Sequence, residues 1–491
     1  MLGMTAPLLL ALVLGYFALL FGVARWAARR GGAATNDSFF IGNRQSHWGL
    51  VAFGMIGTSL SGVTFVSVPG SVGSTAFGYF QIALGQFVGY ALIAFVLLPL
   101  YYRLRVTSIY QVLGERLGPE AHRTGAVFFL VSRLLGATAR LYLVARVLHD
   151  GVLLPLAPGV PFALTAAVLV GVVLLYTLEG GVKAIVWTDT LQTTGMLVGL
   201  LACGAWVLHA LGASPAEAWA RLDEAGLRTV FVTDPDSRHF WAKQLLAGAA
   251  IAVAMTGLDQ EMMQKNISVP RLADAQKNLL VMSTLMLGVV FLFLLLGGLL
   301  QLFALQAGVA ARGDALFPTV VLQHLPALAQ AVFVLALVSA LLPSADGALT
   351  ALTASTCLDL LRLPQRADLN EAQRTRLRRA VHLCFAAAFL ALVMAFRAVD
   401  NPHMIGLILK LAGYTYGPLL GLFLASLLRW PPTRPGWTLP VALAAPALCF
   451  AIDANQAALF GSYQIGLELL LLNAGFTLLG LRLARTPSRS A

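Results

Sequence analysis

The sequence has 491 residues, of which 58% are hydrophobic and only 11% are charged, and its mean hydropathy is +0.80. This balance excludes an ordinary soluble domain and predicts an integral membrane protein. The formal charge of +11 does not indicate nucleic acid binding, because lysines and arginines cluster in alternate loops between apolar stretches. The lipid bilayer is therefore an expected partner, and no nucleic acid is expected.

Long apolar stretches fill the chain, and short alternating strands do not. Because only helices and closed barrels satisfy their backbone groups in lipid, an all-α fold is predicted, with about thirteen transmembrane helices in one domain, residues 1–491. The predicted spans cover residues 5–24, 47–70, 77–101, 124–147, 161–178, 184–210, 242–264, 278–305, 327–360, 380–397, 404–428, 438–453 and 463–483.

Basic residues concentrate in every second loop and thus on one side of the membrane. These clusters are Arg25, Arg29, Arg30 and Arg44; Arg103, Arg105 and Arg116; Lys265, Arg271 and Lys277; Arg362, Arg366, Arg374, Arg376, Arg378 and Arg379; Arg429 and Arg434; and Arg482, Arg485 and Arg489. The positive-inside rule places the N-terminus outside and the C-terminus in the cytoplasm of a plasma membrane, the inner membrane in a bacterium. The first apolar segment lacks a preceding basic region, so we expect a retained helix and not a cleaved signal peptide.

Residue types that catalyse reactions or hold metals are scattered. Cys203, Cys357, Cys384 and Cys449 lie in or beside apolar spans without CxxC spacing, which predicts neither a metal site nor a disulfide framework. The histidines also fall near span ends or in loops, so we do not expect an intramembrane enzyme. The absence of a GxxxxGK[ST] loop argues against ATP-driven transport by this chain alone, and no organic cofactor is expected.

Two spans carry residues typical of interrupted helices, which in membranes occur where freed backbone groups line a cavity or meet an ion. The second span contains GMIGTSLSGVTFVSVPGSVGS at 54–74, and its Gly, Ser and Thr residues from 57 to 64 favour an unwound segment over tight packing alone. The ninth span offers a second such region, VSALLPSADGALTALTAST at 338–356. Hydroxyl and carbonyl oxygens are hard ligands that suit Na⁺.

Ionisable residues inside predicted spans are costly and therefore point to function. Asp189, in the sixth span, either draws a cation to a transport site or caps a helix and pairs with Lys183 or an arginine.

The fourth span carries Arg133 and Arg140, seven residues apart and so on roughly one helical face. These arginines either pair with Asp259, Glu261 or Asp346, or one of them holds a substrate carboxylate as a bidentate fork.

Several segments, in this order, resemble the sodium/solute symporter family, whose members include sodium/proline, sodium/galactose, sodium/sialic acid and sodium/iodide transporters. The most specific match is YTLEGGVKAIVWTDTLQ at 176–192, with its Gly-Gly pair and its Trp-Thr-Asp-x-x-Gln pattern. Supporting matches are DSFFIGNRQSHW at 37–48, GLDQEMMQKNISVPRLADAQKN at 257–278 and GYTYGPLLGLFL at 413–424. The resemblance covers nearly the whole chain.

The resemblance implies a leucine-transporter-type fold with two inverted five-helix repeats, here residues 47–210 and 242–428, flanked by peripheral helices in 1–46 and 429–491. It also implies a sodium site between the broken first helix of repeat one and the third helix of repeat two. Carried onto this sequence, the sodium-binding residues are Gly57, Leu60 and Ala336 through their carbonyls, Ser339 through its hydroxyl, and Asp189 in a supporting role.

The neighbouring positions bear on the coupling ion. Many relatives have a second hydroxyl where this chain has Ala340, so coupling to sodium or to protons stays open at this point. Members that bind a second sodium add hydroxyls where Leu342 and Pro343 stand here, and the resemblance thus implies a single coupling ion.

The solute is expected near mid-membrane, where the two broken first helices of the repeats meet. The candidate substrate-binding residues are Ser59, Ser61 and Thr64 on the second span, Gln81 with Tyr79, Phe80 and Gln86 on the third, Arg133 and Arg140 on the fourth, and Asp259 and Gln260 on the seventh. The third-span residues are equally well interpreted as interfacial aromatics and packed amides. Relatives that carry sialic acid use an arginine on the fourth helix, which suggests an anionic organic solute.

The sequence thus predicts a secondary active transporter, not an enzyme, that couples Na⁺ to symport of a small organic solute, anionic or sugar-like, by alternating access. One alternative is a proton-coupled symporter of the same fold. Another is a membrane solute sensor without transport. A sensor would carry a kinase or regulatory tail, and this chain ends a few residues after its last predicted span.

Overall fold

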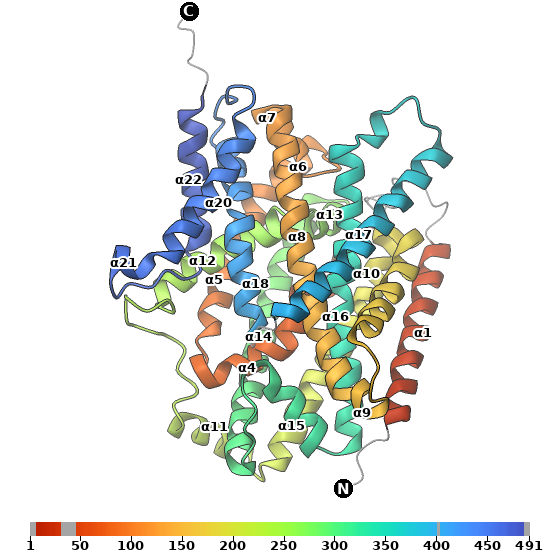
Figure 1. The fold of residues 1–491 in the computed structure, drawn as a ribbon, viewed down its shortest axis with the longest axis vertical. Helices are drawn as coiled ribbons and strands as arrows, with labels where there is room; N and C mark the ends of the chain where they lie inside the picture. Colours follow the sequence, from red (N-terminus) through yellow and green to blue (C-terminus); the bar gives the residue numbers. More distant parts are fainter. Residues whose placement is uncertain (1–5, 31–45, 400–402, 486–491) are drawn as a thin grey trace, which may run out of the picture.

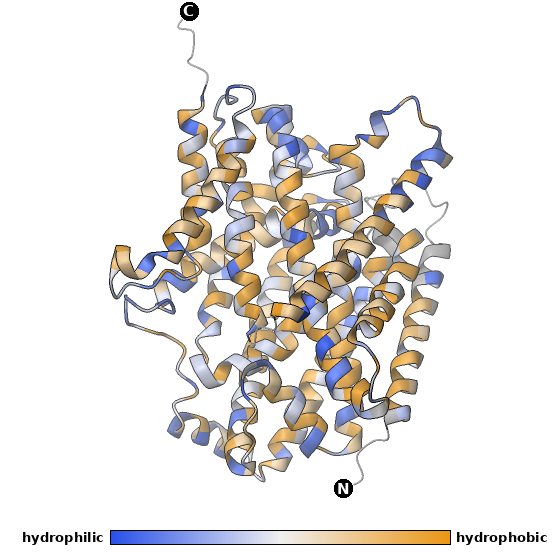
Figure 2. Cartoon of the chain, viewed as in Figure 1, coloured by the Kyte–Doolittle hydropathy of each residue, from blue (hydrophilic) through white to orange (hydrophobic). Residues whose placement is uncertain are grey.

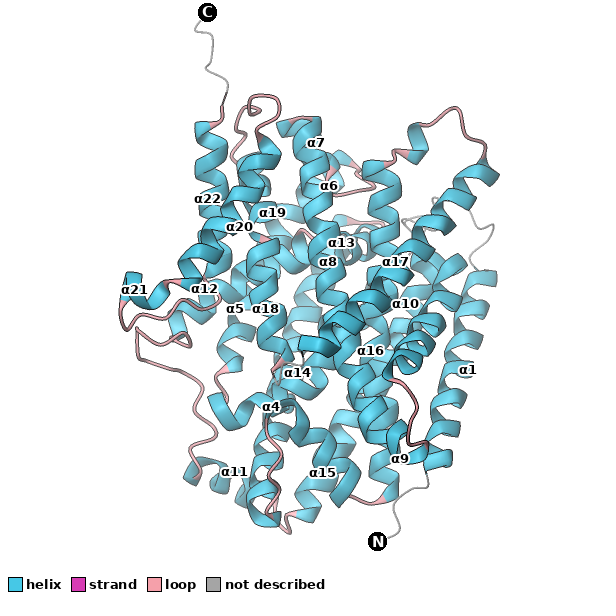
Figure 3. Cartoon of the chain, viewed as in Figure 1, coloured by secondary structure: helices cyan, strands magenta, loops and turns pink. Residues whose placement is uncertain are grey.

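The computed structural model describes residues 6–30, 46–399 and 403–485, and every regular element within them is a helix (Figures 1 and 3). The main helices are α1 (Ala6–Arg30), α3 (Trp48–Ser59), α4 (Gly62–Thr75), α5 (Tyr79–Leu92), α6 (Leu98–Leu104), α7 (Gln111–Leu117), α8 (Pro119–Leu148), α9 (Leu154–Leu156), α10 (Phe162–Ala210), α11 (Pro215–Glu224), α12 (Trp241–Ala252), α13 (Gln260–Ile267), α14 (Leu272–Ala307), α15 (Leu316–His324), α16 (Ala327–Ser355), α17 (Glu371–Val399), α18 (Met404–Thr415), α19 (Gly417–Leu427), α20 (Thr438–Ala454), α21 (Gln456–Phe460) and α22 (Leu469–Leu483).

The apolar helices correspond one to one with the predicted spans. In the described part of the chain, six helices are long and apolar enough to cross a membrane, three more candidates are bent pairs, and four are shorter apolar helices of 10–17 residues. The predicted spans 161–178 and 184–210 follow each other without a loop, because α10 is helical from Phe162 to Ala210. Figure 2 shows hydrophobic residues along the length of these helices and hydrophilic ones mainly at their ends and in the loops.

The second span is broken where the sequence predicted it. Helix α3 ends at Ser59, α4 begins at Gly62, and the two axes differ by 56°. Leu60 and Ser61 form the break, with Leu60 in a non-helical conformation (φ −96°, ψ 77°). The mixture of Gly, Ser and Thr residues explains why the chain interrupts the helix here, since these residues favour caps and turns.

The ninth span is not broken, and the prediction of a second interrupted region at 338–356 was wrong. Helix α16 runs continuously from Ala327 to Ser355 with Pro343 inside it. A proline removes only one backbone hydrogen bond, here the one to the Ser339 carbonyl, and membrane helices tolerate this loss. Here Ser339 donates to the Leu335 carbonyl at 2.7 Å and Ser344 to the Leu341 carbonyl at 2.8 Å.

Two other spans carry sharp bends instead. The seventh span consists of α12, the π-helical turn Val253–Gly257 and α13, with a 67° bend at Leu258 and Asp259. Helices α18 and α19 meet at Tyr416 with a bend of 46°. The proposed repeats, residues 47–210 and 242–428, begin with the second and the seventh span. Both of these spans are interrupted.

Helices α5 and α12 cross through glycines. Gly85 and Gly89 form a GxxxG pair on α5, and a Cβ added to Gly85 would lie 2.2 Å from the backbone oxygen of Leu245. A Cβ added to Gly248, on α12, would lie 2.4 Å from the Ile82 oxygen. Such small-residue contacts let two backbones approach closely, which is how membrane helices gain packing energy without a hydrophobic driving force.

Replacing Gly85 with alanine should destabilise this crossing, because the obstructing atom belongs to backbone and cannot move aside. We expect a loss of about 1–3 kcal/mol, the usual range for overpacking. The loss would be measured as a lower apparent melting temperature of purified Gly85→Ala in detergent, compared with the wild type. The matched control is Gly288→Ala on α14, where an added Cβ meets nothing within 4 Å; equal effects of the two substitutions would contradict this account.

Candidate functional site

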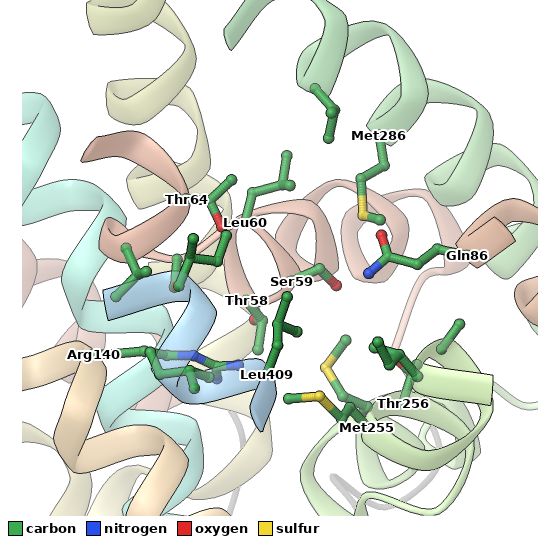
Figure 4. Close-up of a pocket in the computed structure, with 18 of the residues that line it drawn as sticks. Thr58, Ser59, Leu60, Thr64, Gln86, Arg140, Met255, Thr256, Met286 and Leu409 are labelled. Atoms are coloured by element: carbon green, nitrogen blue, oxygen red, sulfur yellow. The ribbon is translucent and has the colours of Figure 1, made fainter. Parts of the chain in front are cut away.

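The break in the second span opens onto a small cavity of about 80 Å³ between α4, α5, α8, α14 and α18 (Figure 4). Polar groups are unusually frequent in its wall for a site surrounded by apolar helices. They are Thr58, Ser59, Ser61, Thr64, Tyr79, Gln86, Tyr90, Arg133, Arg140 and Thr256, accompanied by Met255, Met262 and Met286. The structure thus brings together seven of the candidate substrate-binding residues: Ser59, Ser61, Thr64, Tyr79, Gln86, Arg133 and Arg140.

The broken helix presents two kinds of backbone group at this point. The N–H of Leu60 makes the last α-helical bond of α3, to the Ile56 carbonyl, so the carbonyls of the final turn, residues 57–60, have no partner within that helix. At Ser61, where α4 begins, no side chain caps the helix. The break therefore offers carbonyl oxygens for a cation and, from the first turn of α4, N–H groups with a partial positive charge for an anion.

The two arginines of α8 differ in their partners. Arg133 is buried and forms an ion pair with Glu261, and its guanidinium also lies 3.6 Å from the Asp259 carboxylate. Arg140 has no carboxylate within 4.0 Å among the described residues, and Figure 4 shows its side chain extending from α8 into the cavity. Of the two interpretations left open by the sequence, pairing with protein acids holds for Arg133, and Arg140 remains available to a ligand.

Asp189 belongs to a second buried cluster. The ammonium of Lys265 lies 2.7 Å from Asp189, 2.8 Å from the Thr58 hydroxyl and 3.3 Å from Glu261. Lys265 is 3% exposed and Asp189 is fully buried. The placement of Lys265 in a basic loop was therefore wrong. It lies one helical turn after Glu261 on α13, and both side chains point into the protein.

The proposed sodium ligands lie on two helices that pack against the same stretch of α10. On α3, a Cβ added to Gly57 would lie 2.3 Å from the Thr193 hydroxyl. On α16, Ser339 packs against Gly195 of α10, where an added Cβ would lie 2.5 Å from the serine hydroxyl. Ala336 packs against Gly199 of α10, where an added Cβ would lie 2.1 Å from the alanine Cβ. The Ser339 hydroxyl also lies 2.7 Å from Tyr16 on α1.

The second half of the broken span also packs near α16. At the start of α4, a Cβ added to Gly62 would lie 3.5 Å from the backbone of Leu341 on α16.

The other four candidates, Phe80, Gln81, Asp259 and Gln260, do not line this cavity, and the last three have structural roles. Gln81 accepts a hydrogen bond from the Val232 N–H and donates to the carbonyls of Gly78 and His239, so its amide holds the segment after α11. Gln260 bridges the Ile109 N–H and the Thr107 carbonyl.

Asp259 caps α13 through the Met262 N–H and accepts from the Tyr416 hydroxyl. Asp259 and Gln260 are thus fixed by their position at a helix start, where acids and amides satisfy free backbone groups.

Some lining residues were not predicted. Met255 and Thr256 come from the π-helical turn before the seventh-span bend, and Met286 comes from α14. Methionine adapts its shape to a ligand. π-Helical turns also occur often at functional sites, but a one-residue insertion of this kind leaves no mark in the hydropathy pattern.

A larger vestibule of about 390 Å³ lies beside the cavity. The two share Tyr79, Ile405 and Leu409 in their walls, so this thin layer of side chains separates them. Charged residues around the vestibule include Lys410, which pairs with Asp453 at 2.7 Å. The vestibule is thus the evident approach to the small cavity.

Asp314 ties the loop before α15 to this vestibule, since its carboxylate accepts the N–H of Met404 at 2.9 Å. Burial raises the pKa of the Asp314 carboxyl above its ordinary value, and the bond from Met404 offsets this only in part. The raised pKa means that Asp314 binds a proton more tightly when its loop is docked against Met404 than when the loop is free. Docking is therefore favoured at acid pH, and it weakens as the pH rises through the pKa of the docked state.

Replacing Asp314 with asparagine should therefore stabilise the protein at neutral pH and make little difference in acid, because the amide oxygen still accepts the Met404 N–H but never ionises. Apparent melting temperatures of both proteins, measured in steps from about pH 4, close to the ordinary Asp pKa, up to pH 7.5, test this. A constant difference between the two proteins across that range would contradict the titration of Asp314.

Comparisons with known proteins show the family and the fold of this chain. The sequence profile of the sodium:solute symporter family matches residues 39–434. The sodium-dependent multivitamin transporter of Oryctolagus cuniculus is 27% identical over 414 residues, 81% of this chain and 62% of that protein. The human sodium/iodide cotransporter is 24% identical over 441 residues, 86% of this chain and 66% of its own length. This chain thus spans just under two thirds of the length of these two relatives.

A bacterial relative matches over more of its length. The sodium/sialic acid symporter of Aliivibrio fischeri is 23% identical over 437 residues, 84% of this chain and 81% of that protein. Among solved structures, a Na⁺-coupled sialic acid symporter in a substrate-bound outward-open state superposes with a TM-score of 0.80, at 16% identity and 97% coverage of both chains.

A nucleobase-cation-symport-1 family transporter in a closed conformation gives a TM-score of 0.54 at 13% identity, covering 92% of this chain and 95% of that one. These structural matches show the fold, a helical membrane protein of the leucine-transporter type. With the profile match over most of its length, the chain belongs to the sodium:solute symporter family.

Proposed function

We propose that this protein is a secondary active transporter that couples the inward movement of Na⁺ to the uptake of a small organic anion by alternating access. The observation that carries the choice of solute is Arg140, an arginine in the cavity wall that has no carboxylate within 4.0 Å among the described residues. A cation in such a place is expensive unless a ligand compensates it.

The start of α4 supports the same choice. Ser61, Val63 and Thr64, at the start of this helix, line the cavity, and the helix dipole adds positive potential there. Arg140 and this helix start together would bind a carboxylate from two directions, with Ser59, Ser61 and Thr64 available as further hydrogen-bond partners. The cavity volume of about 80 Å³ suits a compact solute.

For the coupling ion we propose one sodium site at the other face of the same break. Its ligands would be the carbonyls of Gly57, Leu60 and Ala336 and the hydroxyl of Ser339. These are hard oxygens, the ligand type that suits Na⁺. Two of them belong to the unpaired last turn of α3, which supports the assignment, and Ala340 leaves one position for water.

Coupling follows from the shared element. Sodium at the end of α3 and a carboxylate at the start of α4 both fix the geometry of the break, so each raises the affinity of the other, commonly by about 1–3 kcal/mol. In the proposed repeats, 47–210 and 242–428, alternating access then moves one repeat relative to the other around the site. The membrane potential adds about 2.3 kcal/mol per charge per 100 mV.

The orientation proposed from the basic loops assigns the vestibule to the outside. Arg238 and Asp314 in its wall come from segments 211–240 and 308–315. The first mixes three arginines with five acidic residues, and the second has Arg312 as its one cation. The described conformation would then be the one that receives solute from outside through the layer of Tyr79, Ile405 and Leu409. In a bacterium the membrane would be the inner membrane.

Uptake into proteoliposomes tests this function. Radiolabelled short monocarboxylates should accumulate under an inward Na⁺ gradient and not under an equal K⁺ gradient, whereas the uncharged amides of the same acids should not accumulate. Accumulation driven by a proton gradient alone would replace sodium by proton coupling. Selective accumulation of amides or sugars would overturn the anionic solute.

Replacing Ser339 with alanine should raise the Na⁺ concentration needed for half-maximal uptake about tenfold or more, since a ligand oxygen is lost, while the solute KM at saturating Na⁺ stays near the wild-type value. Ser344→Ala is the matched control, because Ser344 is an equally buried serine on the same helix that bonds only within it. An unchanged sodium dependence of Ser339→Ala would remove this site assignment.

A further inference from the structure

The buried ammonium of Lys265 has no role in the proposed sodium and solute sites. Lys265 lies on α13, beyond the 67° bend of the seventh span, and its ammonium makes three short contacts with oxygens of Asp189, Thr58 and Glu261. All of these residues are buried. An ammonium is a compact cation with three donors, and here all three have an oxygen partner.

The surroundings of Asp189 offer more oxygens than Lys265 uses. The second carboxylate oxygen of Asp189, Oδ1, is buried without a hydrogen-bond partner, and so are the Thr193 hydroxyl and the amide group of Gln192. These three residues lie on one face of α10, at spacings of three and four. Thr193 in turn contacts Gly57 of α3, whose carbonyl is a proposed sodium ligand. Buried oxygens without a donor call for a further partner, such as an ordered water or an ion.

We propose that the Lys265 ammonium is a tethered cation that takes the place of a second transported sodium ion at Asp189, so that Lys265 sets the number of sodium ions moved with each solute. The proposal rests on the sodium-coupled function above. It explains why a carboxylate is retained in this buried position, since a buried charge needs a partner, and why one coupling ion suffices: the second positive charge belongs to the protein.

The position of the ammonium strengthens this assignment. Its contact Thr58 lies between Gly57 and Leu60, so a free sodium ion at Asp189 and one at the break would both stand against the last turn of α3. A fixed ammonium in the first of these positions repels a second mobile cation there. Because Lys265 moves with α13, it also leaves or rejoins Asp189 whenever the bend of the seventh span changes.

Removing the ammonium should therefore create a sodium site. In Lys265→Met the apolar stem is kept, Asp189 loses its cation, and Na⁺ is expected to replace it. In proteoliposomes, the reversal potential of solute flux should then correspond to one more Na⁺ per solute than in the wild type. The double variant Asp189→Asn/Lys265→Met, which removes both charges, should return to the wild-type number, and Lys265→Arg should keep it.

Thermal stability gives a second reading that does not depend on transport. Purified Lys265→Met should melt at a lower temperature in choline chloride, because Asp189 is left unpaired, and NaCl should restore more stability to it than to the wild type or the double variant. An unchanged stoichiometry, together with a sodium effect on melting equal to the wild type, would overturn the proposal. So would a gain of proton coupling in place of sodium.

These outcomes separate the inference from the proposed function. If the wild type shows no sodium-coupled uptake, the function itself fails. If the wild type is sodium-coupled but Lys265→Met moves the same number of ions, the function stands and only the tethered cation is wrong.

Discussion

Replacing Arg140 with glutamine should raise the KM for the transported carboxylate roughly 100-fold, because Arg133, the other arginine described in the cavity wall, is already paired with Glu261. A charge-assisted, bidentate contact of this kind is worth about 3 kcal/mol when the partner charge is otherwise buried, and each 1.4 kcal/mol is tenfold. The measurement is initial uptake of the radiolabelled carboxylate into proteoliposomes at saturating Na⁺.

The variants at this position should form a series. Arg140→Lys keeps the charge but loses the planar fork, so its KM should fall between those of the wild type and Arg140→Gln. Arg146→Gln is the matched control on the same helix, since Arg146 is partly exposed and pairs with Asp150 at 3.7 Å. A wild-type KM in Arg140→Gln would show that the solute is not anchored at this arginine.

The sequence predicted the arrangement of spans because hydropathy, charge and length act locally. The break at residues 60 and 61 was also predictable, since glycine, serine and threonine cluster there and compete with the helix for backbone hydrogen bonds. The same reasoning failed at Pro343, where Ser339 and Ser344 bond within α16 and the neighbouring turns preserve the helix. Composition alone does not distinguish these two outcomes, because both segments are rich in small and hydroxylated residues.

The roles of individual charges were harder to predict because they depend on partners far away in the sequence. Arg133 and Arg140 lie on one face of α8, but only Arg133 meets Glu261, 128 residues later. Lys265 was assigned to a loop because three cations follow the seventh span, although its spacing of four from Glu261 was readable. Gln81 and Gln260 are amides that satisfy backbone groups of other segments, and hydropathy says nothing of those contacts.

Replacing Glu261 with glutamine should be among the most destabilising single changes in this protein. Glu261 is 3% exposed and its two carboxylate oxygens face different cations, Arg133 and Lys265. Removing one member of a buried ion pair commonly costs about 3–5 kcal/mol. Here Arg133 would keep only Asp259, at 3.6 Å, and Lys265 only Asp189, so the buried cluster would hold excess positive charge. We expect the apparent melting temperature in detergent to fall well below that of the wild type.

An exposed pair supplies the control for this substitution. Asp223 and Arg228 are joined at 2.7 Å, but their side chains are 56% and 36% exposed. Solvent screens such a pair, so Asp223→Asn should change stability by about 1 kcal/mol or less. If Glu261→Gln were as mild as Asp223→Asn, the Arg133–Glu261–Lys265 cluster would not hold α8 and α13 together, and a cation at Asp189 would have no reason to be tethered there.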